Sequence, residues 1–280
     1  MRNRFGGTIV STVVVAALTG VAMTAIFRIA EQPLAGQARA YRAPRTPDGK
    51  PDLNGIWQAL NTASWDLQDH PSQPSPITAM GARGAIPGGL GVVEGGEIPY
   101  KPEALAKKNE NRQNWLARDP TVKCYMPGVP RATYMPFPFQ IVQGPDQILI
   151  AYGFANTSRV VFINGKETGP ADSWMGWSNG HWEGETLVVD VTSLNDQTWF
   201  DSAGAYHSDA LHVVERYTAT SPDHLMYEAT IEDPVVFTRP WKIRMPLYRI
   251  IDQNAQLVEF NCVEFVEELV YGHLRKKTKP

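Results

Sequence analysis

Titratable side chains gather in residues 207–217, "HSDALHVVERY", beside apolar residues that favour β-strands. His207 has acidic neighbours on both sides in the sequence, with Asp201 before it and Asp209 after it. An imidazole oriented by a carboxylate is the ordinary arrangement for general acid–base chemistry near neutral pH. We therefore name His207 as a candidate catalytic group, with Asp201 or Asp209 as its orienter. The alternative is that these side chains cap a turn through backbone hydrogen bonds.

Glu215 is a second candidate acid–base group. Strand side chains alternate between two faces, and Glu215 and Tyr217 share the more apolar face of the strand expected over 210–220. The same alternation places Arg249 and Glu264 on apolar faces of later strands. Buried charges are costly unless paired, so we expect these charged groups to meet one another, a water cluster or a ligand. They form either a structural ion-pair network or the polar floor of a ligand site. An arginine nearby would oppose a raised glutamate pKa.

Residues 193–209, "SLNDQTWFDSAGAYHSD", form an unusually long connection between two expected strands. Connections of this length in a compact domain are usually functional or disordered. This one carries three aromatic side chains that can cover an apolar ligand, so we interpret it as a lid. The candidate ligand-binding residues are Trp199, Phe200, Tyr206, Tyr217, Arg249, Glu264 and Trp177. The alternative for the tryptophans is that they fill the core or the barrel ends.

Signatures of metal and nucleotide chemistry are missing from the sequence. We find no Gly-x-Ser-x-Gly elbow, no phosphate-binding glycine loop after a strand and no His-Glu-x-x-His. His207 and His212 are five residues apart, and the other histidines fall in separate expected turns or termini. We therefore expect no metal and no cofactor.

The strands that would position these groups follow one another over residues 137–268, with turn signals between them. Asn179-Gly180 is one such signal, and the last expected strand covers 257–268. Nine or so strands with almost no helix between them cannot form a parallel βαβ sheet, because parallel crossovers need a dozen or more residues. We predict an all-β fold, an antiparallel up-and-down barrel that removes its own edges by closing. A β-sandwich is the alternative.

The segment before these strands is expected to be irregular. Residues 68–99 hold too many glycines and prolines for a helix or a central strand, so we expect a surface loop or a flap there. One exposed helix is predicted over 102–118, with Pro102 near its first position. We therefore expect residues 41–280 to form a single β-rich domain.

The first forty residues are typical of an export segment. Arg2 and Arg4 precede an uncharged run over 5–27, and Ala38-Arg39-Ala40 fits a cleavage site. The run is also long enough to be an uncleaved membrane anchor. Both alternatives place residues from 41 onward outside the cytoplasm, either periplasmic or secreted, or anchored facing the periplasm. The formal net charge of −3 gives no general attraction to nucleic acid.

Cys124 and Cys262 are the only two cysteines of the chain. In an oxidising compartment they are expected to form one disulfide. Two buried free thiols are the alternative.

Gly55-x-Trp57, in "DLNGIWQ", resembles the first strand of the lipocalin-like, or calycin, group. The combination of "RTPDGKPDLNGIW", "CYMPGVPR", "WEGETLVVDV", "HSDALHVVERY" and "TRPW" is similar to a set of exported bacterial proteins of unassigned function. The resemblance implies a secreted β-rich domain and carries over no catalytic residue.

Two functions follow as hypotheses. The first is a cofactor-independent lyase, hydratase or isomerase that acts on an apolar, aromatic or cyclic small molecule in a barrel pocket, with His207 or Glu215 as the acid–base group. The second is a binding or carrier protein of the cell envelope that holds the same kind of molecule without turnover.

Overall fold

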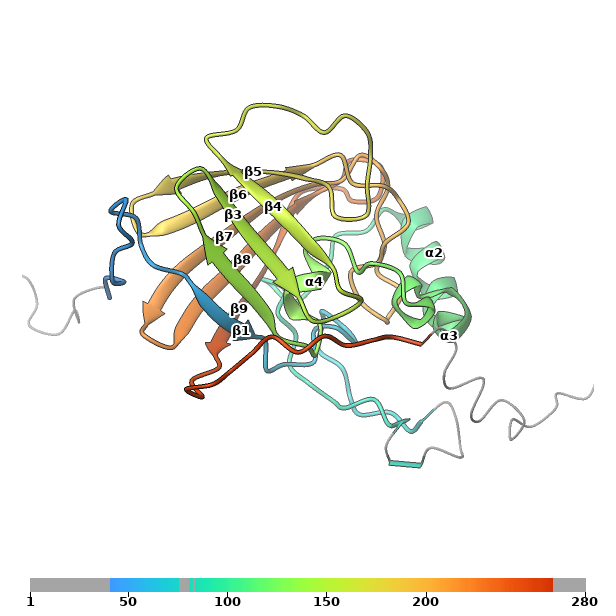
Figure 1. The fold of residues 1–280 in the computed structure, drawn as a ribbon. Helices are drawn as coiled ribbons and strands as arrows, with labels where there is room; N and C mark the ends of the chain where they lie inside the picture. Colours follow the sequence, from blue (N-terminus) through green and yellow to red (C-terminus); the bar gives the residue numbers. More distant parts are fainter. Residues whose placement is uncertain (1–40, 76–80, 83, 264–280) are drawn as a thin grey trace, which may run out of the picture. The chain divides into compact units, whose positions relative to one another are not determined.

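The computed structural model describes residues 41–75, 81–82 and 84–263. The chain divides into two compact units, 1–40 and 41–280, and every described residue belongs to the second. In the described residues nine strands close into one barrel in sequence order (Figure 1). The predicted all-β barrel is therefore confirmed, and the sandwich alternative is wrong.

The strands are β1 (Gly55–Gln58), β2 (Phe139–Gln143), β3 (Gln147–Tyr152), β4 (Ser158–Ile163), β5 (Trp177–Glu183), β6 (Thr186–Thr192), β7 (His212–Ser221), β8 (His224–Glu232) and β9 (Trp241–Arg249). The helices are α2 (Pro102–Gln113), α3 (Trp115–Arg118), the 3-10 helix η2 (Pro120–Lys123) and α4 (Arg131–Tyr134). The helix predicted over 102–118 is thus present as α2 and α3, interrupted at Asn114.

One strand pair departs from the antiparallel pattern. β4 and β5 pair in parallel, from Val161 opposite Ser178 to Ile163 opposite Gly180, so the barrel is mixed. The chain between these strands crosses back before it enters β5, and Asn179-Gly180 lies within β5 rather than in a turn. A Cβ at Gly180 would lie 2.6 Å from a Val161 methyl carbon. Glycine is therefore explained there by close strand packing and not by a hairpin.

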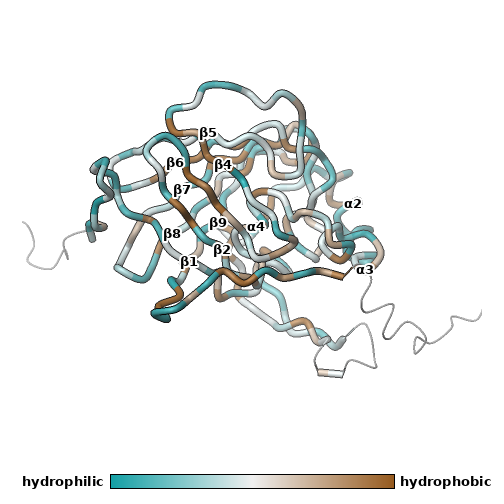
Figure 2. The backbone as a smooth tube through the Cα atoms, in the orientation of Figure 1, coloured by the Kyte–Doolittle hydropathy of each residue, from teal (hydrophilic) through white to brown (hydrophobic). Residues whose placement is uncertain are grey.

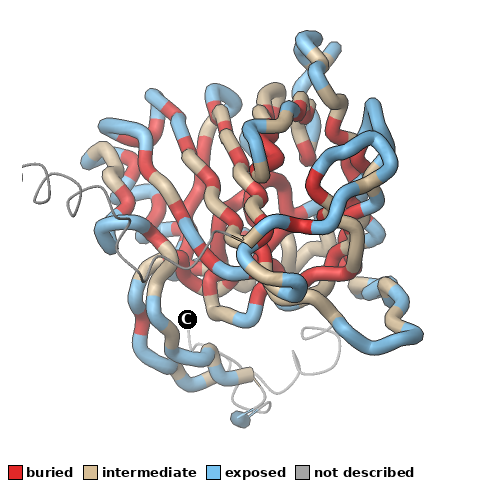
Figure 3. Tube along the Cα trace, turned by 90° about the vertical axis from the view of Figure 1, so that its left-hand side faces the viewer, coloured by how far each residue is buried: buried red, intermediate tan, exposed pale blue. Residues whose placement is uncertain are grey.

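The barrel interior is filled by inward-facing side chains. In β7 and the residue before it, Leu211, Val213, Glu215 and Tyr217 are buried, which confirms the faces assigned from alternation. Figure 3 shows the same alternation of buried and more exposed positions along the strands. Figure 2 shows apolar stretches along the strands and hydrophilic residues in many of the connections. Tyr134 of α4 is fully buried as well, so this short helix contributes to the packed core.

The short strand β1 closes the barrel by pairing with both β2 and β9. The guanidinium of Arg249, at the end of β9, lies 4.2 Å from the centre of the Trp57 ring. It also donates hydrogen bonds to the carbonyl oxygens of Asn54 (2.6 Å) and Pro222 (3.0 Å). Gly55 has a φ of +143°, and a Cβ there would lie 2.2 Å from Arg249 Nη1. The Gly-x-Trp motif thus serves barrel closure, with Arg249 at the barrel rim.

The strand predicted over 257–268 is wrong in its described part. Residues 257–263 form no strand and make only an isolated bridge, Phe260 with Phe154. The remainder of that segment, including Glu264, lies outside the described residues. Cys262 is bonded to Cys124, with the two Cα atoms 5.5 Å apart, so the predicted disulfide is confirmed. It joins the tail after β9 to the turn that follows η2.

The excursion over 68–99 folds back on itself in its described part. Bridges pair His70 with Gly89 and Gln73 with Ile86. It contains no helix or strand longer than a bridge or a single turn among the residues described there, which agrees with a loop. No described helix is both long and apolar enough to cross a membrane.

Candidate functional site

Glu215 belongs to a buried group that we call the lumen cluster, formed by Tyr152, Arg159, Glu215, Tyr217 and Tyr227. Glu215 Oε2 forms an ion pair with Arg159 Nη1 at 2.6 Å. The angles at this contact do not meet those of a hydrogen bond. The Tyr217 and Tyr227 hydroxyls donate to Glu215 Oε1 at 3.0 and 2.8 Å. The buried carboxylate is therefore neutralised by Arg159 at Oε2 and hydrogen-bonded by two tyrosines at Oε1.

The lumen cluster is built as an ion pair surrounded by neutral tyrosines. Burial alone would lower the pKa of the Arg159 guanidinium, but Glu215 and two tyrosines raise it well above its ordinary value. Burial, followed by the charge of Glu215, raises the pKa of both Tyr217 and Tyr227. Arg159 also donates to the Tyr152 hydroxyl (2.9 Å). These contacts fix the Glu215 carboxylate in place and leave the guanidinium charged.

The expectation that Arg249 would meet Glu215 is wrong, because Arg249 lies at the rim over Trp57. The partner of Glu215 is Arg159. In the segment "SRVVFI", Arg159 is two residues before the fully buried Val161 and so lies on the same face of the strand. Applying the alternation to that segment would have placed Arg159 inside. Arg249 instead lines a small rim cavity of about 100 Å³.

His207 is buried and has a partner on each ring nitrogen. Its Nδ1–H donates to the Ser208 carbonyl oxygen (2.8 Å), and its Nε2 accepts from the Thr198 hydroxyl (2.6 Å). This pattern satisfies a neutral ring, and burial lowers the His207 pKa. Neither Asp201 nor Asp209 orients the imidazole. Asp209 is exposed, whereas its neighbour Ser208 is anchored by hydrogen bonds to Asp233.

Asp201 lies fully buried between two segments of irregular chain. Its carboxylate accepts hydrogen bonds from the backbone N–H groups of Leu67 and Ala205, both at 3.0 Å. Burial, and then the charge of Asp66, raises the pKa of Asp201 to about 6. Asp201 thereby ties residues 64–67 to residues 201–205.

The predicted lid over 193–209 packs into the end of the barrel. Trp199, Phe200 and Tyr206 are all buried, and Phe200 makes ring contacts with His207 and Trp241. These aromatic side chains act as core in this structure. Trp177 is half-buried on the outer side of β5, stacked on Phe162 with ring centres 4.8 Å apart. Of the expected ligand contacts, Tyr217 lies in the lumen cluster beside Glu215.

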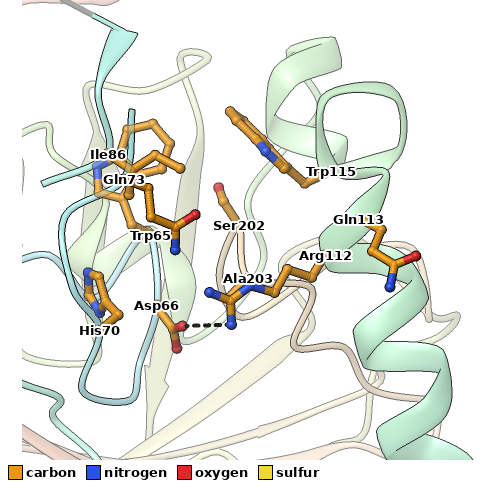
Figure 4. A pocket seen from close by; sticks show the side chains of 10 residues that line it. All are labelled: Trp65, Asp66, His70, Gln73, Ile86, Arg112, Gln113, Trp115, Ser202 and Ala203. Carbon is orange, nitrogen blue, oxygen red and sulfur yellow. Dashed lines mark ion pairs between the residues drawn. The ribbon is translucent and has the colours of Figure 1, made fainter. Parts of the chain in front are cut away.

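A cavity of about 280 Å³ lies outside the lumen (Figure 4). It is bounded by the irregular chain that follows β1, by the helices α2 and α3, and by the connection over residues 193–211. We call it the end pocket. Its lining residues come from three separate segments: Trp65, Asp66, His70, Gln73, Ile86, Arg112, Gln113, Trp115, Ser202 and Ala203.

The end pocket has an aromatic side and a charged side, as Figure 4 shows. The indole rings of Trp65 and Trp115 meet edge to face, with centres 5.8 Å apart. Away from them, the Arg112 guanidinium lies 3.7 Å from the Asp66 carboxylate. An apolar body with a polar end fits such a site.

A buried ion pair fixes the floor of the end pocket. Arg131 binds Asp119 through two hydrogen bonds of 2.8 Å, and Ser202 bridges the two residues. Burial alone would raise the Asp119 pKa, but Arg131 and Ser202 hold it below its ordinary value. Asp201 precedes Ser202 in the sequence, but it is fully buried and is not among the lining residues. Sequence reasoning missed the pocket because only the fold brings its three segments together.

Metal ligation is not evident in the part of the chain that the structure describes, where no group of three or more His, Cys, Asp or Glu side chains could hold an ion.

Comparison of the chain with protein-family models, with curated proteins and with solved structures finds no match.

Proposed function

We propose that this protein binds a small, largely apolar molecule in the end pocket and holds it without turnover. The observation that carries the proposal is a partly open cavity with Trp65 and Trp115 on one side and polar side chains, among them Asp66 and Arg112, on the other. Ligand sites in proteins are typically concave and mainly apolar, with volumes from roughly 300 Å³ upward. A cavity of about 280 Å³ therefore suits a molecule of about one ring.

The packed lumen supports this choice of site. Lipocalin-like barrels can hold one ligand inside, but here Trp57, Tyr217 and Tyr227 are among the fully buried side chains that occupy the interior. A ligand in the lumen would have to displace them and break the Glu215–Arg159 ion pair. The end pocket requires no such rearrangement.

The disulfide between Cys124 and Cys262 fits an oxidising compartment. We propose that residues from 41 onward act in the periplasm or after secretion, in keeping with the export segment predicted over residues 1–40, which lie outside the described residues, and with the resemblance to exported bacterial proteins. A small-molecule carrier of the cell envelope would account for both the end pocket and the oxidising compartment.

The test is ligand capture by the exported protein. Small molecules that co-purify are identified by native mass spectrometry, and their affinities are then measured by calorimetry. Trp115→Ala should weaken binding about tenfold or more, because it removes one aromatic wall. Trp177→Ala removes an indole from the outside of the barrel and should leave the affinity unchanged. Equal effects of the two changes, or none, would contradict the site.

An acid–base enzyme is the second candidate, because the residue before Ser202 of the pocket lining is Asp201, a buried carboxyl whose pKa of about 6 suits proton transfer near neutral pH. In this form the protein is a cofactor-independent lyase, hydratase or isomerase, and Asp201 is its candidate acid–base group. The captured compound is incubated with wild type and with Asp201→Asn. Product formation that disappears in Asp201→Asn while binding persists supports the enzyme. Recovery of the compound unchanged from wild type supports the carrier.

A further inference from the structure

The charged side of the end pocket is an ion pair that is not closed. At 3.7 Å, Arg112 and Asp66 are too far apart for a direct hydrogen bond. Within the described residues the Arg112 guanidinium donates no hydrogen bond, although it carries five N–H groups. Asp66 Oδ1 accepts from the Gln68 backbone N–H (3.0 Å), which leaves Oδ2 facing Arg112. Both charges therefore offer free hydrogen-bonding capacity to a ligand.

The Arg112–Asp66 pair disfavours ligands that carry a charge of only one sign at this side of the pocket. A simple anion bound at Arg112 would be repelled by Asp66, and a simple cation bound at Asp66 would be repelled by Arg112. A head group that carries both charges avoids both repulsions. The α-carboxylate of an amino acid can accept from Arg112 while its α-ammonium donates to Asp66.

The remainder of the ligand is restricted by the aromatic side. Trp65 and Trp115 already contact each other edge to face, with centres 5.8 Å apart, so a ligand ring packs beside the pair and against an exposed indole face. Ile86 adds an apolar contact at this side. A volume of about 280 Å³ limits the side chain to about one ring.

We propose that the end pocket binds a free zwitterionic α-amino acid with a single-ring aromatic side chain. This inference rests on the proposed binding function and specifies its ligand class. Arg112 binds the carboxylate, Asp66 binds the ammonium, and the two tryptophans contact the ring.

The experiment compares four probes by calorimetry on the exported protein. L-phenylalanine carries all three features. 3-Phenylpropionate lacks the ammonium, 2-phenylethylamine lacks the carboxylate, and L-alanine lacks the ring. L-phenylalanine should bind about tenfold tighter than each of the others, since each lost contact is a charge-assisted hydrogen bond or a ring contact.

Two variants assign the head-group contacts. Arg112→Gln should remove the preference for L-phenylalanine over 2-phenylethylamine. Asp66→Asn keeps an oxygen for the Gln68 N–H and should remove the preference over 3-phenylpropionate. Arg118→Gln is the matched control, because Arg118 pairs with Glu110 on the exposed side of the helices and should not affect binding.

The outcomes separate this inference from the proposed function. If 3-phenylpropionate or 2-phenylethylamine binds as tightly as L-phenylalanine, the zwitterion is wrong and small-molecule binding stands. The same conclusion holds if no probe binds but a co-purified compound binds in a Trp115-dependent way. If no compound binds in a Trp115-dependent way, both proposals fail.

Discussion

At the scale of single residues, Arg159 and Glu215 form a buried ion pair inside the barrel. Removing one member of a buried ion pair leaves an uncompensated charge, which typically costs about 3–5 kcal/mol. We expect Arg159→Met to lower the free energy of unfolding by about this amount in urea denaturation.

Arg216→Met is the control, because Arg216 pairs with Glu183 on the outer face of the barrel and its loss should change stability little. The double change of Arg159→Met with Glu215→Gln should restore much of the loss, because the uncharged amide oxygen can still accept from the Tyr217 and Tyr227 hydroxyls. Equal effects of Arg159→Met and Arg216→Met would contradict a structural role for the lumen cluster.

Asp201 makes stability depend on pH. Its folded-state pKa of about 6 lies above the ordinary value of 3.8, so the folded protein retains a proton that the unfolded chain releases. The stabilising contribution is complete below pH 3.8 and is lost as the pH rises through about 6. The loss is about 3 kcal/mol, from about two pH units at 1.36 kcal/mol each.

The difference in unfolding free energy between wild type and Asp201→Asn should therefore fall as the pH is raised from 4 to 7. Exposed Asp209→Asn serves as the control and should track wild type across this range. Parallel curves for wild type and Asp201→Asn would show that the Asp201 pKa is ordinary.

The sequence predicted which face of a strand a side chain occupies, and it predicted little else about the position of single residues. Alternation placed Glu215 and Tyr217 inside the barrel, because strand geometry fixes the face of every side chain. It did not distinguish the middle of a strand from its end, so Arg249 was assigned to the interior although it lies at the rim. The acidic residues near His207 in the sequence did not identify its partners. Its ring nitrogens are hydrogen-bonded to the Thr198 hydroxyl and the Ser208 carbonyl oxygen instead.

At the scale of elements, most strands were recognisable from apolar alternation and turn residues. The parallel pairing of β4 and β5 was not, because nothing local in the sequence specifies which partner a strand takes after a long crossover. The tail beyond β9 has a strand-like pattern over 257–263, yet it stays outside the sheet because the barrel is already closed by β1.

Barrel closure by β1 makes Gly55 sensitive to substitution. Gly55→Ala would place a Cβ 2.2 Å from Arg249 Nη1 at a φ that alanine rarely adopts. The guanidinium would have to leave the Asn54 carbonyl oxygen and the Trp57 ring, so the total cost should be about 2–3 kcal/mol in thermal unfolding. Gly184→Ala also has a positive φ, but its Cβ would meet open space, so a cost near 1 kcal/mol is expected. If both substitutions cost the same, the Arg249 contact does not require glycine. Combining Gly55→Ala with Arg249→Ala should recover the part of the loss that the clash causes.

At the scale of the whole molecule, the disulfide links the tail after β9 to the region of α3 and η2, across 138 residues of sequence. In the chain-entropy model a loop of this length contributes roughly 3–5 kcal/mol. Replacing both cysteines by serine should lower the denaturation midpoint accordingly, and reducing agent should then have no further effect on that variant. An unchanged midpoint would show that the crosslink does not stabilise the fold.

The end pocket is itself a property of the whole molecule. Three segments that are far apart in the sequence line this pocket: the irregular chain after β1, the helices α2 and α3, and the connection over residues 193–211. They meet only because the barrel places them at one end. No local pattern joins Trp65, Arg112 and Ser202, which is why composition and motifs pointed to the lumen instead.

The sharpest test of ligand binding in the end pocket is a crystal structure of the protein grown with L-phenylalanine. We expect a single bound molecule in the end pocket, with its ring against Trp65 and Trp115, its carboxylate on Arg112 and its ammonium on Asp66. The Glu215–Arg159 pair in the lumen should be unchanged. A ligand in the lumen that displaces this pair, or an end pocket that stays empty at saturating concentration, would contradict it.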